Sequence, residues 1–380
     1  VTLDGSPGRA EDLPTLLVEG GQRITLKGLR VTGGRRGLFA TDVKDLSLND
    51  VRFEANLRQG VLMINTQATW SNVVVTKTQP DRDRTRGEGI NLDNSQVTIT
   101  GGAITDNAER GVILQGLAQT TLTLDNVTIS NNVADGVALF DAVHATIVNS
   151  RITGTRRDVQ GNHGIGVIAS GTSRLTLEGS QITRNELSGI WIDERAEATL
   201  RNNTVSDHAS NTFGIAIVAN AKAHLEGNTV ARNNAGGIGV ADSAEATIAN
   251  NASTNNVQPG TQCCAGISVY GQSKTTIRGN TASGNNVGVF VAQQAQSTIT
   301  GNTLNGNRNG LEVGNGGFQS ETVNAVVTGN TMRNNTSCGA YADNDTRISI
   351  TGSGNTISGN TQANLCGNAN KFPRGFGGGR

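Results

Sequence analysis

Residues 298–313 read "TITGNTLNGNRNGLEV" and alternate aliphatic side chains with a high density of Asn and Gly. The aliphatic residues favour strands, whereas Asn and Gly tolerate the left-handed backbone conformation that sharp turns require. The stretch therefore has the composition of short strands joined by a tight turn. That composition is explained if the stretch is one unit of a longer repeat.

The pattern around Gly310 does recur along the chain. A glycine followed by aliphatic-x-aliphatic, here named the marker glycine, returns at steps of 22–29 residues. Such a period is the signature of a repeat architecture, in which each unit adds one layer to the fold. The marker glycines are Gly37, Gly60, Gly89, Gly111, Gly136, Gly164, Gly189, Gly214, Gly237, Gly266, Gly288, Gly310 and, more weakly, Gly339.

Each unit contains three short segments of alternating hydrophobicity. One unit has Leu122-x-Leu124, Val127-x-Ile129 and Val137-x-Leu139. Alternation over a few residues is typical of strands that bury one face. Three short strands per unit predict an all-β fold, a single-stranded parallel β-helix of about 13 coils stacked about 4.8 Å apart. A leucine-rich repeat needs more Leu, and a propeller blade needs about 40 residues.

Asparagine occupies two turns of the predicted coil. Stacked amides can hydrogen-bond along the axis, as Asn ladders do in cross-β stacks, so we interpret both columns as structural. The first column contains Asn203, Asn228, Asn251, Asn280, Asn302, Asn330 and Asn355. The second contains Asn56, Asn107, Asn132, Asn185, His208, Asn233, Asn256, Asn285, Asn307, Asn335 and Asn360.

Composition limits the partners of this chain of 380 residues. Aromatics make up 3% of it and Gly numbers 50, so a thin core of small aliphatic side chains is expected. The 31 basic and 31 acidic residues give zero net charge and no basic stripe, which argues against nucleic acid as a partner. No apolar run approaches the ~20 residues of a membrane span.

The repeated "GNT...NN...GIxV" pattern resembles the right-handed parallel β-helix proteins of the pectin-lyase-like superfamily. The resemblance covers residues 24–367 and implies a right-handed helix. Residues 1–23 are then an N-terminal cap or incomplete first coil, and 368–380 a mobile tail. Known members include polysaccharide lyases, hydrolases and mannuronan epimerases. The Asp-Pro-His motif of the epimerases and the clustered Asp pair of polygalacturonases are both missing from this sequence, so no catalytic position is carried over.

The strand after the marker glycine is where this superfamily usually places its active cleft. Four long insertions, 78–89, 155–164, 208–214 and 257–266, fall at the turn just before it, as expected for loops that build a site. Outward positions of this strand hold several of the few aromatics, which could stack on sugar rings or be covered by the inserted loops. The predicted ligand-binding aromatics are Phe140, Trp191, Tyr270, Phe290 and Tyr341.

A second outward surface carries a column of Thr, from Thr25 to Thr298. A flat Thr array suggests ice binding, but the adjacent column includes Lys27, Asp125 and Arg278, whose charges would spoil such a surface. Thr is also common in half-buried strands, so the column is interpreted as β propensity.

Two charged loops are candidates for catalysis. In the first, Asp81, Asp83 and Glu88 could hold calcium and the neighbouring Arg residues a uronate carboxylate, although mixed charges also suit an ordinary solvated loop.

The second loop offers Arg156 and His163, the latter a candidate general base. The candidate catalytic residues are Asp93, Arg156, His163 and Asp193. Asp93 and Asp193 lie four coils apart, roughly 19 Å, too far for a glycosidase pair.

Of the four cysteines, Cys338 and Cys366 hold the same place in adjacent coils and predict a disulfide. Cys263 and Cys264 are adjacent and either form a vicinal disulfide or remain free. A disulfide implies an oxidising compartment, so the protein is expected to be secreted or at the cell surface. The sequence leaves the oligomeric state open.

Three functions follow from these features. The first is a protein that binds polysaccharide along the aromatic, loop-edged face. The second is a polysaccharide lyase, epimerase or hydrolase that uses the same face, and the third is a structural or adhesive rod with no small ligand.

Overall fold

The computed structural model of the protein describes residues 1–5, 13–81, 86–117, 119–209, 211–257, 264–314, 322–345 and 347–377. They divide into two compact units. The first comprises Val1–Leu187 with Ala196–Ala198, and the second Ser188–Arg195 with Thr199–Arg380. Within the described ranges, the regular elements are β-strands and one short 3-10 helix, η1 (Ala369–Lys371), so that no helix is long and apolar enough to cross a membrane.

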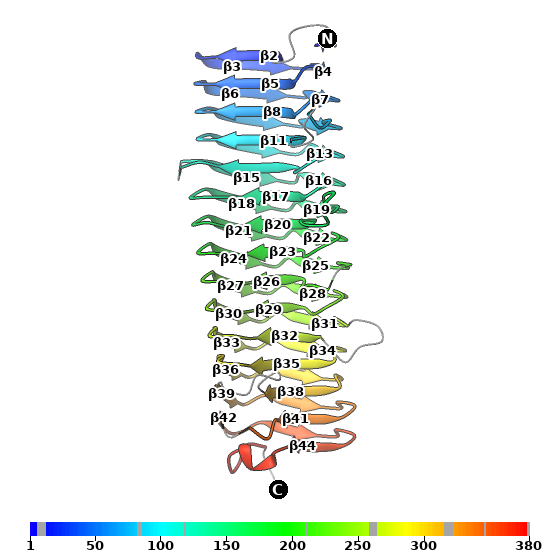
Figure 1. Ribbon diagram of the computed structural model, residues 1–380, viewed down its shortest axis with the longest axis vertical. Coiled ribbons are helices and arrows are strands. Elements are labelled where there is room, and N and C mark those ends of the chain that lie inside the picture. The colour runs from blue at the N-terminus through cyan, green and yellow to red at the C-terminus, as the bar shows by residue number, and fades with distance from the viewer. Residues whose placement is uncertain are drawn as a thin grey trace. The chain divides into compact units, whose positions relative to one another are not determined.

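The strands of the first unit form three parallel sheets, each built from every third strand of the chain (Figure 1). Sheet 1 contains β1 (Thr2–Asp4), β4 (Arg30–Thr32), β7 (Arg52–Glu54), β10 (Val74–Thr76), β13 (Ala103–Thr105), β16 (Thr128–Ser130), β19 (Arg151–Thr153) and β22 (Gln181–Thr183). Sheet 2 contains β2 (Pro14–Glu19), β5 (Arg36–Thr41), β8 (Gln59–Ile64), β11 (Glu88–Asp93), β14 (Val112–Gln115), β17 (Asp135–Leu139) and β20 (Ile165–Ala169). Sheet 3 contains β3 (Gln22–Lys27), β6 (Lys44–Asn49), β9 (Gln67–Ser71), β12 (Gln96–Thr100), β15 (Thr121–Asp125), β18 (His144–Val148) and β21 (Arg174–Glu178).

The second unit repeats this plan, and the strand β24 (Glu197–Arg201) is shared between the two. Its sheet 1 contains β25 (Thr204–Ser206), β28 (Thr229–Ala231), β31 (Ala252–Thr254), β34 (Thr281–Ser283), β37 (Thr303–Asn305), β40 (Thr331–Arg333) and β43 (Thr356–Ser358). Its sheet 2 contains β23 (Ile190–Ile192), β26 (Ile215–Ile217), β29 (Ile238–Val240), β32 (Ala265–Val269), β35 (Val287–Ala292), β38 (Asn309–Gly314), β41 (Cys338–Ala342) and β44 (Ala363–Gly367). Its sheet 3 contains β27 (Lys222–Glu226), β30 (Glu245–Ala249), β33 (Lys274–Arg278), β36 (Gln296–Thr300), β39 (Val323–Thr328) and β42 (Ile348–Thr351).

The predicted parallel β-helix is therefore confirmed, with about 14 turns in the described residues. Its core is the thin aliphatic column that the composition predicted. Leu122 pairs with Val97 and Leu124 with Ile99, and all four side chains are buried. The Thr residues between them, Thr98 and Thr123, face away from this core.

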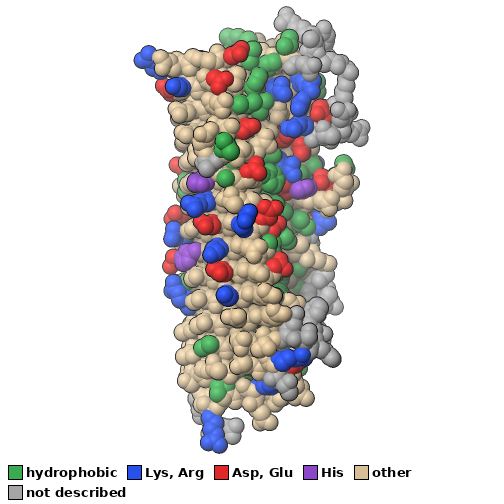
Figure 2. Space-filling view, turned by 60° about the vertical axis from the view of Figure 1, so that its left-hand side comes forward, with side chains coloured by type: hydrophobic (Ala, Val, Ile, Leu, Met, Phe, Trp, Pro, Cys, Tyr) green, Lys and Arg blue, Asp and Glu red, His purple; other side chains and the backbone are tan. Residues whose placement is uncertain are grey.

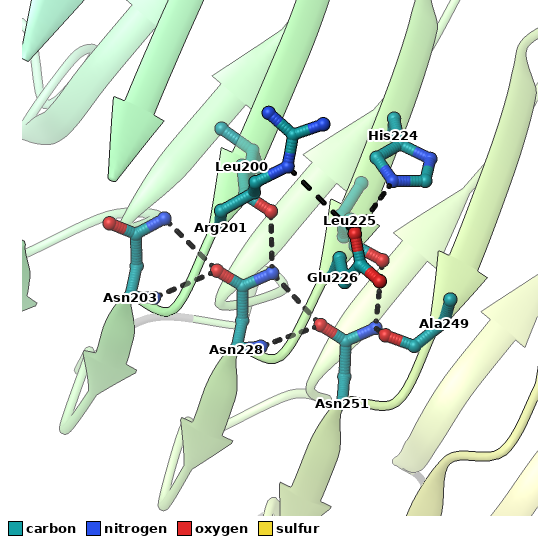
Figure 3. A network of polar contacts seen from close by, with 9 residues as sticks. All are labelled: Leu200, Arg201, Asn203, His224, Leu225, Glu226, Asn228, Ala249 and Asn251. Carbon is teal, nitrogen blue, oxygen red and sulfur yellow. Dashed lines mark hydrogen bonds and ion pairs between the residues drawn. The ribbon is translucent and has the colours of Figure 1, made fainter. Parts of the chain in front are cut away.

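The second unit also contains the Asn ladder between sheets 3 and 1. The backbone N–H and Nδ2 of Asn228 both donate to Asn251 Oδ1 at 2.8 Å, and the same pair of bonds reaches Asn228 from Asn203 (Figure 3). Each amide is buried yet bonded along the axis, which satisfies the polar groups at a turn that closes against the core. At this turn the last two coils of the first unit have Ser150 and Ser180 instead, and Ser150 N–H donates to Ser180 Oγ at 3.0 Å.

The second predicted ladder runs between sheets 1 and 2 and is likewise confirmed. Asn107 donates to Asn132 Oδ1 at 2.9 Å in the first unit, and Asn233 donates to Asn256 Oδ1 at 3.0 Å in the second. His208 takes one position of this column and donates its backbone N–H to Asn233 Oδ1 at 3.3 Å.

One marker glycine was wrongly aligned. Val137 pairs with Val167, so Gly166 and not Gly164 takes the place of Gly136 in the next coil. The segment "GIGV" contains both glycines, and each is followed by an alternating aliphatic pattern. Periodicity therefore allowed either register, and the length of the preceding loop decides between them.

Both ends of the chain make ordered contacts. Near the N-terminus, β1 pairs with β4 and β2 with β5. At the other end, Phe372 and Phe376 are buried with ring centroids 4.8 Å apart, and Phe376 O accepts a hydrogen bond from Asn355 Nδ2 at 2.9 Å. Residues 368–377, assigned above to a mobile tail, thus pack against the last coils.

Candidate functional site

The first unit has a cluster of charged side chains, here named the charged corner, where the strands of sheet 2 begin. The residue directly before each marker glycine forms a column there. Its members, in order along the unit, are Arg36, Gln59, Glu88, Arg110 and Asp135. Within this column, Arg36 Nε donates to Gln59 Oε1 at 2.8 Å, and Arg110 Nε donates to Asp135 Oδ2 at 3.1 Å.

Arg110 lies at the centre of this corner. Its Nη1 is 2.9 Å from Glu109 Oε1, and its guanidinium carbon lies 5.5 Å from the ring centroid of Phe140. The side chain of Arg110 is only 15% exposed. A half-buried cation held by two carboxylates and an aromatic ring is positioned firmly, since each contact restricts the guanidinium plane.

Asp135 also organises His163. The carboxylate is fully buried, and its Oδ2 lies 3.1 Å from His163 Nδ1. Its Oδ1 accepts the backbone N–H of Ile165 at 3.3 Å. The hydrogen bond to Asp135 raises the pKa of His163 above its usual value. His163 is thus an imidazole oriented by a buried carboxylate, which is the arrangement of a residue that can transfer a proton.

Two further carboxyl groups in this corner have perturbed acidity. Burial, followed by the charge of Glu88, raises the pKa of Glu109 to about 7. Burial also raises the pKa of Glu88, whose Oε1 lies 3.4 Å from Arg86 Nη1. A carboxyl group with a pKa near 7, such as that of Glu109, is typical of sites that transfer protons.

Several polar atoms of β11 and of Glu109 are buried without a partner among the described residues. Asn91 is 1% exposed, yet neither its Oδ1 nor its Nδ2 has a hydrogen-bond partner there. Glu88 Oε2 and Glu109 Oε2 are likewise buried and have no hydrogen-bond partner among the described residues. Asn91 faces away from the core, since its strand neighbours Ile90 and Leu92 belong to the core. Buried polar atoms are almost always bonded, so these atoms indicate a place for a polar ligand or water.

The predicted catalytic residues do not all meet. Asp93 ends β11, and its carboxylate lies against Gly116 of the next coil. Arg156 is exposed and donates Nη2 to Asn131 O at 3.1 Å. Asp193 accepts Trp191 Nε1 at 3.4 Å in the second unit.

The predicted aromatics are half-exposed and have different neighbours. Phe140 lies under Arg110 in the first unit. In the second, Tyr270 contacts Phe290 edge-on at 5.5 Å and Phe213 at 6.4 Å, so these rings pack on one another.

The proposed calcium ligands remain an open prediction. Asp83 lies outside the described residues, whereas Asp81 and Glu88 lie within them. Within the described part of the chain, no group of three or more His, Cys, Asp or Glu side chains could hold a metal ion.

Sequence reasoning missed Glu109, Arg110 and Asp135, although a signal was available. In the first unit, charged residues precede Gly37, Gly89, Gly111 and Gly136, whereas Val287, Asn309 and Cys338 occupy this place in the second. A charge repeated at one position of a stacked coil brings those residues together.

The predicted disulfide between Cys338 and Cys366 is confirmed, with its Cα atoms 6.0 Å apart. The two cysteines do not hold the same place in adjacent coils as predicted, because Cys338 pairs in register with Ala363 and Cys366 with Tyr341. Two side chains three residues out of register still meet across adjacent coils. Cys264 is disulfide-bonded as well, while Cys263 lies outside the described residues.

Surface charge agrees with the balanced composition. On the face drawn in Figure 2, Lys and Arg are interspersed with Asp and Glu. This face shows no broad surface of one sign.

Comparisons with known proteins agree on the architecture. No curated protein sequence matches this chain. Among solved structures, a periplasmic alginate epimerase AlgG variant superposes with a TM-score of 0.53 at 11% identity, over 84% of this chain and 77% of that chain. A chain from the Vag8–C1 inhibitor complex superposes with a TM-score of 0.54 at 11% identity, over 96% and 97%. At such low identity these likenesses show the fold alone.

The sequence itself matches the family described as "Right handed beta helix region" over residues 36–157, 143–266 and 262–372. These matches span most of the chain and include every residue of the charged corner. The chain belongs to the right-handed β-helix family.

Proposed function

We propose that this protein binds an acidic polysaccharide on the outer surface of sheet 2 in the first unit. The observation that carries the proposal is the buried amide of Asn91, which has a donor and an acceptor but no partner among the described residues. A sugar hydroxyl can both donate and accept, so it would satisfy both atoms of the amide.

The basic side chains at the start of the sheet 2 strands, where β11 begins three residues before Asn91, favour an anionic ligand. The pKa of Arg36 is lowered by burial and by the charges of Arg58, Arg35 and Arg86. Guanidinium groups bind carboxylates strongly, and a uronate carboxylate would relieve their mutual repulsion. One protein of the same fold is named an alginate epimerase, which supports a polysaccharide as the ligand.

A second candidate function is an enzyme of the lyase or epimerase type at the same place. It is favoured by Glu109, whose pKa of about 7 suits a general acid or base, and by the His163–Asp135 pair. Both reactions require removal of a proton from the sugar ring beside a carboxylate.

The disulfide supports a secreted or cell-surface location, since such bonds persist in oxidising compartments. The neighbour described as periplasmic is consistent with this proposal.

Asn91→Leu tests the binding proposal. Its neighbours in the outward column are Leu62 and Ile113, so a leucine should be accommodated without loss of the fold. We expect acidic polysaccharides to bind the natural protein and to bind the variant at least tenfold more weakly, measured by calorimetry. Asn49→Leu, on sheet 3, is the matched control and should bind normally. Failure of every acidic polysaccharide to bind would contradict the proposal and favour a structural rod.

The same polysaccharides test the enzyme. After incubation, mass spectrometry reads chain length and unsaturated ends, and NMR reads epimerised residues. Product that disappears in Glu109→Gln or His163→Gln, with binding retained, would establish the second candidate. Binding without product would exclude it for those polysaccharides.

A further inference from the structure

The outer surface of sheet 2 carries a pocket in the second unit, far along the chain from the charged corner. Its volume is about 350 Å³, at the low end of the roughly 300–1,000 Å³ of small-molecule sites. Its lining includes Arg308, Asn309, Glu312, Tyr341, Asp343 and Gln362. All these groups are polar or carry a polar end, which suits a ligand rich in hydroxyls.

The strands β38, β41 and β44 position the pocket. Register places Glu312 beside Tyr341 and Tyr341 beside Cys366. Two glycines fix the side chains over them. A Cβ atom on Gly367 would lie 3.1 Å from Tyr341 Cε2, and one on Gly314 would collide with the Asp343 carboxylate. The Tyr341 ring and the Asp343 carboxylate therefore rest directly on the backbone of neighbouring coils.

The charged side chains that line the pocket determine which class of ligand fits it. Glu312 accepts a hydrogen bond from Asn309 Nδ2 at 3.0 Å, and its pKa is raised by burial and then by the charge of Asp343. Among the described residues that line the pocket, Arg308 is the one cation. A ligand carboxylate would lie beside the carboxyl groups of Glu312 and Asp343, which disfavours an anionic ligand. Sugar hydroxyls can instead donate to the carboxylates and accept from the amides, while the half-exposed face of Tyr341 offers a surface for the ring.

The disulfide forms part of the wall. Cys338 and Cys366 both line the pocket and join β41 to β44. Ser337 Oγ donates to Gln362 Oε1 at 2.8 Å across the same two coils. The last coil thus supplies one side of the pocket, and the disulfide holds it in place.

We propose that this pocket binds one neutral sugar residue and that the Cys338–Cys366 disulfide maintains it. The proposal is independent of the acidic-polysaccharide site, since the two share no residue.

Saturation-transfer difference NMR with methyl glycosides of glucose, galactose and mannose tests it, with methyl glucuronide and glucosamine as charged probes. We expect millimolar binding of at least one neutral glycoside and at least tenfold weaker binding of methyl glucuronide, whose carboxylate would face Glu312 and Asp343. Tyr341→Ala should abolish the signal, and Glu312→Gln should weaken it. Lys274→Ala, at the exposed start of β33, should leave it unchanged.

Cys338→Ser with Cys366→Ser tests the wall. Binding should fall at least tenfold while circular dichroism shows the β-helix retained. The proposal is overturned if no neutral glycoside binds, if only a charged probe binds, or if Tyr341→Ala binds as well as the natural protein. Unchanged binding in a folded double-serine variant overturns the role of the disulfide. Since acidic polysaccharide binding is measured with Asn91→Leu, either proposal can fail without the other.

Discussion

His163 Nδ1 lies 3.1 Å from Asp135 Oδ2, and this carboxylate is completely buried. The partnership raises the pKa of His163 above its ordinary 6.5, because the charged imidazole gains a hydrogen bond and an ion pair. Because the pKa of His163 is higher in the folded than in the unfolded protein, its protonation stabilises the fold. This stabilisation is complete below the pKa of the unfolded protein and is lost as pH rises through the pKa of the folded protein. The pair therefore couples the protonation of His163 to the stability of the charged corner.

Asp135→Asn should lower the pKa of His163. The amide carries no charge, so the imidazolium loses its ion pair, and Arg110 loses one of its two carboxylates. NMR titration of the His163 ring protons measures the pKa, with His163→Gln used to assign the signals. A pKa that does not move in Asp135→Asn would contradict the role of this carboxylate. His163→Gln should lower the free energy of unfolding below pH ~6.5 and matter progressively less above it.

Glu109→Gln should stabilise the protein at high pH. The pKa of Glu109 rises from 4.5 to about 7 on folding, so the folded state pays for ionising it above pH 4.5. Below pH 4.5 the carboxyl is protonated in both the folded and the unfolded protein, so burial of Glu109 does not lower the free energy of unfolding. As pH rises through about 7, the free energy of unfolding falls because the buried carboxyl must ionise. We expect the variant to be about 2–3 kcal/mol more stable at pH 8 and equal at pH 4. Urea unfolding at the two pH values measures this difference, and a variant less stable at pH 8 would refute the burial argument.

Glu54→Gln should have the opposite effect. Hydrogen bonds from Arg52 and Arg30 lower the pKa of Glu54 to about 2, and Lys77 Nζ lies 3.7 Å from it. Its stabilisation is present above pH 4.5 and lost as pH falls through about 2. We expect a loss of about 1–2 kcal/mol at pH 7, because solvent screens the exposed partners. The two substitutions are chemically identical, so opposite changes in the free energy of unfolding would be caused by the different surroundings of Glu54 and Glu109.

The sequence predicted the fold because the features that specify it repeat. The marker glycines, the alternating strands and the two Asn columns each recur coil after coil, and any one coil can be checked against its neighbours. The register of the coils was harder to predict where a loop changes length, as at Gly164. There the sequence has two glycines, Gly164 and Gly166, and the pattern of the repeat fits both.

The site was harder to predict, because its residues come from the ends of loops. His163 was identified, but its partner Asp135 lies 28 positions earlier, directly before a marker glycine. The contact depends on a loop that returns His163, whose φ is 56°, to the previous coil. Likewise, burial of Glu109 causes its raised pKa, and burial beneath loops has no periodic signal in the sequence.

Asn251→Ala should destabilise the second unit strongly. Asn251 Oδ1 accepts two hydrogen bonds from Asn228, and its Nδ2 donates to Leu225 O and Asn280 Oδ1. Removal leaves several buried groups unpaired, at about 1–3 kcal/mol each, so a loss of about 3–5 kcal/mol is expected.

Urea unfolding measures the loss, with Asn220→Ala as the exposed control, expected within about 0.5 kcal/mol of the natural protein. Asn251→Ser should fall between the two, since Ser150 and Ser180 show that a hydroxyl accepts the N–H of the preceding coil. A serine variant no better than alanine would mean that this bond contributes little.

Cys338→Ser with Cys366→Ser should loosen the C-terminal coils without unfolding the rest. The disulfide closes a loop across 28 positions, for which chain entropy gives about 3–4 kcal/mol. In a stack of repeats each coil contacts only its neighbours, so the loss should be local. Hydrogen exchange should therefore accelerate in residues 338–367 and remain slow in β27–β33. The double substitution is preferable to reduction, because Cys264 is also in a disulfide. Exchange that accelerated equally throughout the second unit would show that its coils unfold together, and the disulfide would then stabilise the whole unit and not only its end.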